Sequence, residues 1–345
     1  MSDEACAVLD HVPGGFLDCP AAQLSELLQG PTLFDLPGRD PRPLFVSTLL
    51  HGNEDSGLIA VQEVLRRHAE RGLPRSLLLF IGNVEAAAQN LRMTPEQPDF
   101  NRIWPGTERE PCPHTRMAQW VYEQAARRNI FASIDIHNNT GFNPHYSCIA
   151  QVEPQSIALA LLFSRLVVHS QRPVGTLTNG FAPLAPAITV ECGRAGGETG
   201  KSGATHAAEL LEAALSIAQF PEHAPPAHDV DLLRSFAIVK TPKGASFSFD
   251  GSDADFKFRS GLDQLNFSEL KAGESFGRLG AKGARLEIFP GDGDHAPEEY
   301  FDYADGEIRL SRAAIPAMLT LDPKAIRSDC LCYLMHRIDM KGRKL

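Results

Sequence analysis

The chain has 345 residues, of which 43% are hydrophobic and 22% are charged, and its formal net charge at pH 7 is -10. This length and composition allow a large buried core without disulfides, and they suit one large domain with a smaller one. The negative charge repels nucleic acid phosphates and anionic membrane surfaces, which counts against binding to either.

The sequence carries no recognisable targeting signal. Its first residues lack the basic start and apolar run of a secretory leader. No run of about 18 apolar residues predicts a membrane span. The seven cysteines are irregularly spaced and form no CxxC pair, as is typical of reduced thiols. We therefore expect a cytoplasmic protein with no membrane or nucleic acid partner; the sequence leaves a homo-oligomer open.

Apolar runs and amphipathic stretches alternate up to residue 220. Short runs that are apolar on both faces suit a sheet with helices on both sides. Helices are predicted at 21–28, 56–71, 116–127, 155–169 and 205–220. Strands are predicted at 44–50, 77–81, 131–136, 146–152 and 186–190. This alternation indicates an α/β layered fold.

The composition changes after Phe220. Pro221, Pro225 and Pro226 indicate a linker. Beyond it, short apolar runs separated by glycines predict a β-rich domain. Its predicted strands are 237–239, 247–249, 256–258, 285–289 and 307–310. We place the boundary near residue 224, so that the two domains are 1–224 and 225–345.

The first motif with chemical content is His51-Gly52-Asn53-Glu54, which follows a predicted strand and precedes a predicted helix. In open α/β sheets, sites form at the carboxyl ends of strands. A turn there can aim His51 and Glu54 at one point. An imidazole and a carboxylate are good zinc ligands, although they make only half a site. The alternative is a turn histidine beside a carboxylate favoured by the helix dipole.

A second motif, Asp135-Ile136-His137-Asn138, ends another predicted strand. His137 supplies a third ligand, and two histidines with one carboxylate leave a coordination position open for water. Asp135 shares a strand face with His137 and could support the metal site from its outer shell. An ordinary capping carboxylate is the alternative for Asp135.

Glu191 ends a further apolar strand in Ile188-Thr189-Val190-Glu191-Cys192. Water attacking at a metal needs a base that takes its proton and an acid that returns it to the leaving nitrogen. Glu191 is the candidate for both roles, and a strand-end salt bridge is the alternative. Cys192 is either a reactive thiol near the metal or a buried inert cysteine.

Asn101 and Arg102 suit a carboxylate on the substrate, because arginine presents a planar fork that pairs with a carboxylate in two places. Arg92, ten residues before Arg102, could stabilise the oxyanion as a carbonyl is attacked. Taken singly, each arginine is more often a surface salt bridge.

In order and strand-end placement, these motifs together resemble the succinylglutamate desuccinylase and aspartoacylase family of the zinc carboxypeptidase clan. The resemblance covers about residues 43–215. It implies a mixed central sheet with helices on both faces and a smaller C-terminal β-rich domain. It also implies one Zn²⁺ per chain.

The resemblance implies a role for each site residue. It implies His51, Glu54 and His137 as zinc ligands, Glu191 as general base and acid, and Arg92 as the oxyanion-stabilising residue. Asn101 and Arg102 are implied to hold the free carboxylate of a small substrate. In some members a tyrosine of the second domain reaches the substrate, for which Tyr300 is a candidate and a packed aromatic the alternative.

The leading hypothesis is therefore a zinc-dependent amidohydrolase that cleaves an acyl amide bond of a small carboxylate-bearing substrate, such as an N-acyl amino acid. A metallocarboxypeptidase acting on a peptide or cell-wall fragment is a second hypothesis. A zinc-binding regulator without activity is a third. The polar segment 138–146 after His137 is expected to line the pocket.

Overall fold

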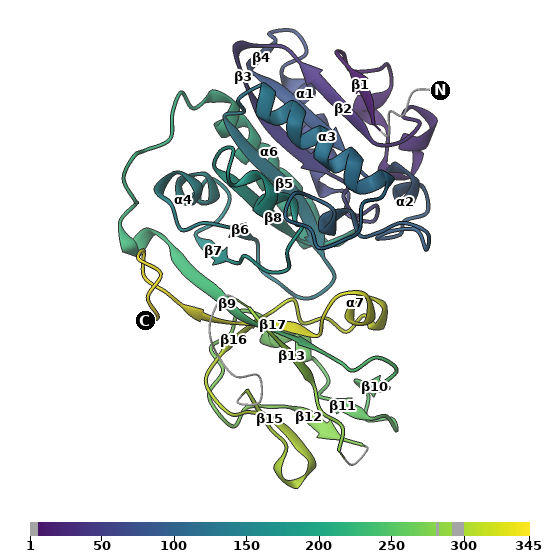
Figure 1. Cartoon of the computed structure of the whole chain (residues 1–345), viewed down its shortest axis with the longest axis vertical. Helices are drawn as coiled ribbons and strands as arrows, with labels where there is room; N and C mark the ends of the chain where they lie inside the picture. Colours follow the sequence, from purple (N-terminus) through teal and green to yellow (C-terminus); the bar gives the residue numbers. More distant parts are fainter. Residues whose placement is uncertain (1–5, 281–282, 292–299) are drawn as a thin grey trace. The chain divides into compact units, whose positions relative to one another are not determined.

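The computed structural model describes residues 6–280, 283–291 and 300–345 (Figure 1). By its contacts the chain divides into two compact units. Unit 1 comprises the residues up to Asn138 together with His145–Asp231, and unit 2 comprises Asn139–Pro144 and Leu232–Leu345.

Unit 1 is built on a mixed sheet with the strand order β1-β2-β4-β3-β5-β8-β6-β7. The central strands β4, β3 and β5 are parallel, whereas β2 and β6 run antiparallel to their neighbours β4 and β8. The strands span Ala7–Leu9 (β1), Thr32–Leu36 (β2), Gly38–Thr48 (β3), Leu73–Ile81 (β4), Ala132–Asn139 (β5), Tyr146–Ile149 (β6), Leu166–His169 (β7) and Ala187–Arg194 (β8).

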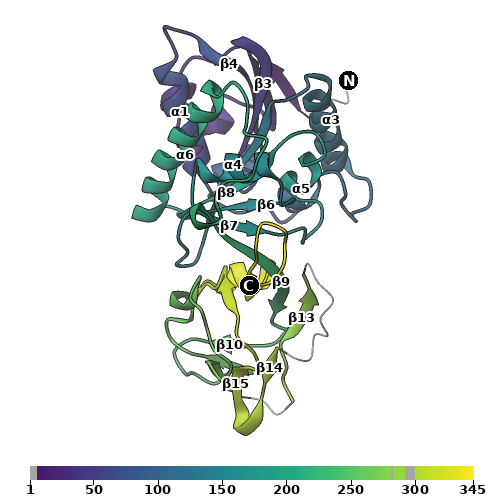
Figure 2. The same cartoon turned by 90° about the vertical axis from the view of Figure 1, so that its left-hand side faces the viewer.

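Helices cover both faces of this sheet. In Figure 2, α1 and α6 lie on one side of it, and α3 and α5 lie on the other. Apolar residues along α1, such as Leu58, Val61 and Leu65, form the buried stripe that holds it on the sheet. The helices span Ser56–Arg67 (α1), Val84–Ala88 (α2), Pro113–Arg127 (α3), Pro154–Leu161 (α4), Leu177–Phe181 (α5) and Glu198–Ser216 (α6).

The side of the sheet that carries α5 also carries the polar residues of β5. On β3, Phe45 packs against Phe181 of α5, with ring centroids 4.5 Å apart. Ser47 shares the face of Phe45 because side chains alternate along a strand. Asp135 is the register partner of Ser47, so Asp135 and His137 point to the α5 side.

Unit 2 contains two arrangements of short strands, which pair antiparallel except for the parallel pair Phe247–Ser248 and Phe256–Phe258. One joins β9 (Asp231–Lys240) to β13 (Glu287–Pro290) and β17 (Cys332–Arg337), and β17 to β16 (Ile315–Ala317). The other has the order β10-β11-β12-β15-β14. Its strands span Phe247–Ser248 (β10), Phe256–Phe258 (β11), Ser275–Leu279 (β12), Glu307–Leu310 (β15) and Phe301–Asp302 (β14). A short helix, α7, spans Pro323–Ser328.

These observations confirm the expected α/β class, the mixed sheet and the β-rich C-terminal part. The helix expected over 155–169 is wrong in its second half, because α4 ends at Leu161 and β7 follows at Leu166–His169. The β-branched pair Val167 and Val168 pairs in parallel with β6 instead. Helix α6 begins at Glu198, earlier than expected, and residues 21–26 form a 3₁₀ helix.

Unit 1 extends to Asp231 rather than to residue 224. The proline-rich segment after Phe220 packs on unit 1, where Arg165 donates from its guanidinium to the carbonyl oxygens of His228 and Asp229. The assignment of Asn139–Pro144 to unit 2 is a second difference that the composition did not indicate.

Among the described residues, none of the helices has the length and apolarity needed to cross a bilayer.

Candidate active site

The turn after β3 sets His51 and Glu54 at the carboxyl end of the strand. Gly52 is required there, because a Cβ at this position would lie 2.2 Å from the backbone nitrogen of Ala87. The turn then leads directly into α1 at Ser56. As a result, both side chains are buried and face the end of the neighbouring strand β5.

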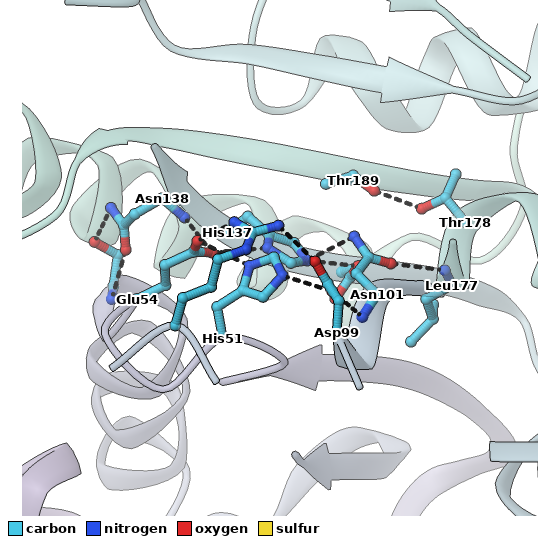
Figure 3. A network of polar contacts seen from close by, with 12 residues as sticks. His51, Glu54, Asp99, Asn101, His137, Asn138, Leu177, Thr178 and Thr189 are labelled. Atoms are coloured by element: carbon cyan, nitrogen blue, oxygen red, sulfur yellow. Dashed lines mark hydrogen bonds and ion pairs between the residues drawn. The ribbon is translucent and has the colours of Figure 1, made fainter. Parts of the chain in front are cut away.

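His51, Glu54 and His137 converge on one point (Figure 3). Nδ1 of His51 lies 2.8 Å from Oε1 of Glu54, and Nδ1 of His137 lies 2.8 Å from Oε2. Their ligand atoms lie within 4.8 Å of one another. We call these three buried side chains the metal cluster, since two imidazoles and a carboxylate are a donor set typical of catalytic zinc.

In each histidine of the metal cluster, the ring nitrogen that does not face Glu54 contacts another carboxylate. Nε2 of His137 is 2.8 Å from Oδ2 of Asp135, and Nε2 of His51 is 3.0 Å from Oδ1 of Asp99. An acceptor at Nε2 keeps a proton there, so that Nδ1 of a neutral imidazole is free to bind a cation. Metal-binding histidines commonly have such partners. Asp135, which was expected to support the site from its outer shell, thus contacts His137 through this carboxylate oxygen.

The charge balance of the site fits a divalent cation. Arg92 lies 2.9 Å from Oδ2 of Asp99 and 3.6 Å from Oε1 of Glu54. With neutral imidazoles, the carboxylates of Glu54, Asp99 and Asp135 against the guanidinium of Arg92 leave a formal charge of -2 over the metal cluster and these neighbours. An uncompensated buried charge is costly, and a divalent ion would cancel it.

The pKa shifts of Glu54 and His137 reflect the electrostatic field of the same charged neighbours. Burial alone would raise the pKa of Glu54, but the facing imidazoles of His51 and His137 hold that pKa well below 4.5. Burial alone would lower the pKa of His137, but the carboxylates of Asp135 and Glu54 raise it well above 6.5. The field that favours a proton on His137 also favours a cation between the histidines and Glu54.

Asn101 and Arg102 lie beside the metal cluster on a short 3₁₀ helix, η3 (Phe100–Arg102). The side-chain nitrogen of Asn101 is 3.4 Å from Nε2 of His137, and its oxygen accepts from the backbone of Leu177 at 3.0 Å. Arg102 donates to the carbonyl of Asn101 at 2.8 Å. Asn101, Arg102 and Arg92, which the sequence suggested as site residues, therefore lie beside the metal cluster.

Glu191 lies on β8, the neighbour of β5, where its register partner is Tyr146. Thr189 shares its face by strand alternation, and the hydroxyl of Thr189 lies 2.7 Å from that of Thr178 in α5. Glu191 is therefore on the same side of the sheet as His137.

Cys192 points to the opposite side of β8 from Glu191 and is buried. Burial raises the pKa of its thiol well above 9.0, and the charges of Glu191 and Glu54 add to the rise. A thiol in that state is a poor nucleophile, which favours the inert cysteine over the reactive one.

Two supporting residues have no clear signal in the sequence. Asp99 accepts from the backbone of Asn101 at 2.7 Å, a local capping contact that any Asp at the start of a helix can make. Its contact with His51 joins residues 48 positions apart. Asn138 bonds Ser56 and the carbonyl of Gly193, and its backbone N–H donates to Glu54 at 3.1 Å. Only the folded chain brings these partners together.

Tyr300 lies in the core of unit 2 and is 2% exposed. Its ring stacks on Phe236 with centroids 5.2 Å apart, and the guanidinium of Arg312 lies over it at 5.1 Å. These contacts correspond to the packed aromatic that was the alternative for this residue.

Solved structures with the same fold carry related names. The succinylglutamate desuccinylase of Chromobacterium violaceum is 18% identical, with a TM-score of 0.56 over 86% of this chain and 85% of that one. A succinylglutamate desuccinylase/aspartoacylase of Rhodobacter sphaeroides is 16% identical, with a TM-score of 0.58 over 88% of each chain. Murine aminoacylase 3 is 14% identical, with a TM-score of 0.54 over 87% of this chain and 97% of that one.

No curated protein sequence matches the chain. The family model of the succinylglutamate desuccinylase/aspartoacylase catalytic domain matches residues 41–218, which is just over half of the chain. This range contains the metal cluster, Arg92, Asn101, Arg102 and Glu191. The resemblance seen in the order of the motifs is thereby confirmed, and the chain belongs to the succinylglutamate desuccinylase/aspartoacylase family.

Proposed function

We propose that the protein is a zinc-dependent amidohydrolase that cleaves the acyl amide bond of a small carboxylate-bearing substrate, such as an N-acyl amino acid. The observation that carries this proposal is the buried metal cluster with a carboxylate on the far nitrogen of each histidine. Membership of a desuccinylase/aspartoacylase family supports the choice of an acyl amide.

His51, Glu54 and His137 would hold the ion. When bound, zinc supplies Lewis acidity and lowers the pKa of water. Asp99 and Asp135 orient the two imidazoles through Nε2. Because these partners are themselves buried, a ring that turned away would leave a buried carboxylate without its imidazole contact.

Glu191 is the proposed general base and acid. In this role its carboxylate takes a proton from the attacking water and returns it to the leaving nitrogen when the amide bond breaks. Its place on the same side of the sheet as His137, at the end of the adjacent strand, supports this role.

Arg92, Asn101 and Arg102 are the proposed substrate contacts. Arg92 is the candidate for stabilising the negative charge that develops on the attacked carbonyl, because its guanidinium lies within 4 Å of Glu54 and Asp99. Arg102 donates to the carbonyl of Asn101 beside the metal cluster, and a planar guanidinium can pair with the carboxylate of the substrate in two places.

The test is Glu191→Gln, which keeps the side chain's shape and removes its ability to accept a proton. We expect kcat to fall by roughly a hundredfold to ten-thousandfold, the usual contribution of a positioned general base. Zinc content and KM should change little. Activity would be measured on a panel of N-succinyl and N-acetyl amino acids with short peptides alongside, and zinc by elemental analysis.

Glu198→Gln is the matched control, since Glu198 is an exposed glutamate of the same unit that pairs with Lys201. It should leave kcat unchanged. Near wild-type turnover in Glu191→Gln would remove Glu191 from the mechanism, and loss of zinc in that variant would make it a ligand instead. A zinc-loaded protein that hydrolyses no member of the panel would contradict the proposed function.

A further inference from the structure

A second pair of histidines faces each other outside the candidate active site. His145 immediately precedes β6, and His206 lies on α6, and both belong to unit 1. Their Nδ1 atoms are 3.1 Å apart, and their rings meet edge to face with centroids 5.1 Å apart. His206 is exposed and His145 is half-buried, so solvent ions can reach the pair.

The contacts of His145 determine which of its nitrogens is available. Its Nε2 lies 2.8 Å from the carbonyl oxygen of Thr199. A carbonyl only accepts, so Nε2 carries the hydrogen. In neutral His145 the lone pair is therefore on Nδ1, which faces His206. Ser164 donates to the backbone carbonyl of His145 at 2.9 Å and holds this residue in place.

This arrangement has the form of half a metal site. Two imidazole nitrogens bound at about 2.0–2.1 Å from one ion, at an angle of about 90–110°, lie about 2.8–3.4 Å apart, and the observed separation is 3.1 Å. A metal-binding histidine usually donates its other N–H to a carboxylate or a backbone carbonyl. Thr199 supplies such a carbonyl to His145.

We propose that His145 and His206 bind a divalent first-row transition ion such as zinc through their Nδ1 atoms. Imidazole suits zinc, copper and nickel, whereas magnesium and calcium prefer oxygen ligands. Within the described residues, the metal cluster is the one group of three or more His, Cys, Asp or Glu side chains placed to hold an ion. Water therefore completes the coordination of the histidine pair, and the ion exchanges readily.

An ion at this position would link two segments that border the strand of Glu191. His145 leads into β6, where Tyr146 is the register partner of Glu191. Thr199 and His206 lie on α6, which begins after the loop that follows β8. A ligand that binds only the folded state stabilises it, so occupancy should raise the melting temperature of the protein.

The experiment is equilibrium dialysis of the zinc-loaded protein against rising zinc concentrations, with elemental analysis. Wild type should take up one further zinc per chain, with a rise in Tm. In His206→Asn the dissociation constant of this second equivalent should increase at least tenfold, and the rise in Tm should disappear. His145→Asn should behave in the same way. His228→Asn is the control, because His228 is an exposed histidine whose ring lies 3.5 Å from a carboxylate oxygen of Asp229.

The site does not depend on the proposed function. His137→Ala should lose the first zinc and keep the weaker one, so failure of one site is distinguishable from failure of the other. Equal uptake of the second zinc by wild type and His206→Asn, or no second equivalent in wild type, would overturn the proposal.

Discussion

The metal cluster of unit 1 and the aromatic core of unit 2 are buried to a similar degree, but they are held by different forces. His137 in the cluster is 3% exposed and Phe276 in the core is 0% exposed. Asp135 is tied to His137 by a directional contact of 2.8 Å between charged or polar atoms. Phe276 packs edge to face on Phe301 with centroids 5.3 Å apart, among other apolar side chains.

The two regions should therefore respond differently to mutation. In the polar region, every side chain is the partner of another, and removing one leaves a buried charge without compensation. In the apolar core, contacts are numerous and non-directional, and the cost of a truncation follows the volume removed. Stability resides in the second kind of region, and the first is the region that we propose to bind a cation.

The segment Asn139–Pro144 connects these two regions along the chain. It directly follows Asn138, which donates to Glu54, yet contact clustering assigns the segment to unit 2. The side-chain nitrogen of Asn266 donates to the carbonyls of Phe142 and Leu319 at 3.2 and 2.8 Å, and its oxygen accepts from Leu319 at 2.9 Å. Unit 2 thus anchors a segment that begins two residues after a proposed metal ligand.

The largest effect is expected from His137→Ala. It removes one of three ligands and leaves Asp135 and Glu54 without their imidazole partner. We expect loss of most of the tightly bound zinc, measured by elemental analysis of the purified protein, and loss of detectable hydrolysis. His228→Ala, an exposed histidine, should retain both. Full zinc retention in His137→Ala would exclude His137 from the metal site.

Phe276→Ala should act on stability alone. Removing a fully buried phenylalanine costs about 3–5 kcal/mol, which would be measured as a shift in urea unfolding. Phe289→Ala should cost less than about 1 kcal/mol, because Phe289 is 44% exposed and its ring lies under the ammonium group of Lys240. At low temperature, folded Phe276→Ala should bind zinc as wild type does. A weaker affinity there would mean that the two regions are not separate.

The smallest effect is expected from Asn266→Ala. It leaves the carbonyls of Phe142 and Leu319 and the N–H of Leu319 without this partner, at a cost of about 1–3 kcal/mol. Hydrogen exchange in 139–144 should accelerate while zinc is retained. Asn266→Asp keeps the acceptor for Leu319 but sets a buried carboxylate oxygen against the carbonyl oxygens of Phe142 and Leu319, so exchange in this variant should be at least as fast as in Asn266→Ala. Unchanged exchange in both variants would show that Asn266 does not anchor the segment.

The sequence alone was sufficient to predict which polar residues lie at the ends of the strands. His51, Glu54, His137 and Glu191 each follow an apolar run of strand length, and the carboxyl ends of strands in an α/β sheet gather at one edge. A local pattern combined with a general rule of topology therefore predicts the metal cluster. The β-rich C-terminal part was predictable for a similar reason, since glycine-separated short runs are a local signal.

Only the tertiary structure decided which groups support the cluster. Asp99 meets His51 across 48 residues, and Asn138 meets Ser56 across 82, and no spacing in the sequence marks such pairs. Strand β7 formed where the local pattern favoured a helix, because pairing with β6 outweighs local propensity. Contacts between distant segments also decide the burial of Tyr300, the assignment of Asn139–Pro144 to unit 2 and the position of His145 opposite His206. The neighbouring residues in the chain do not determine these features.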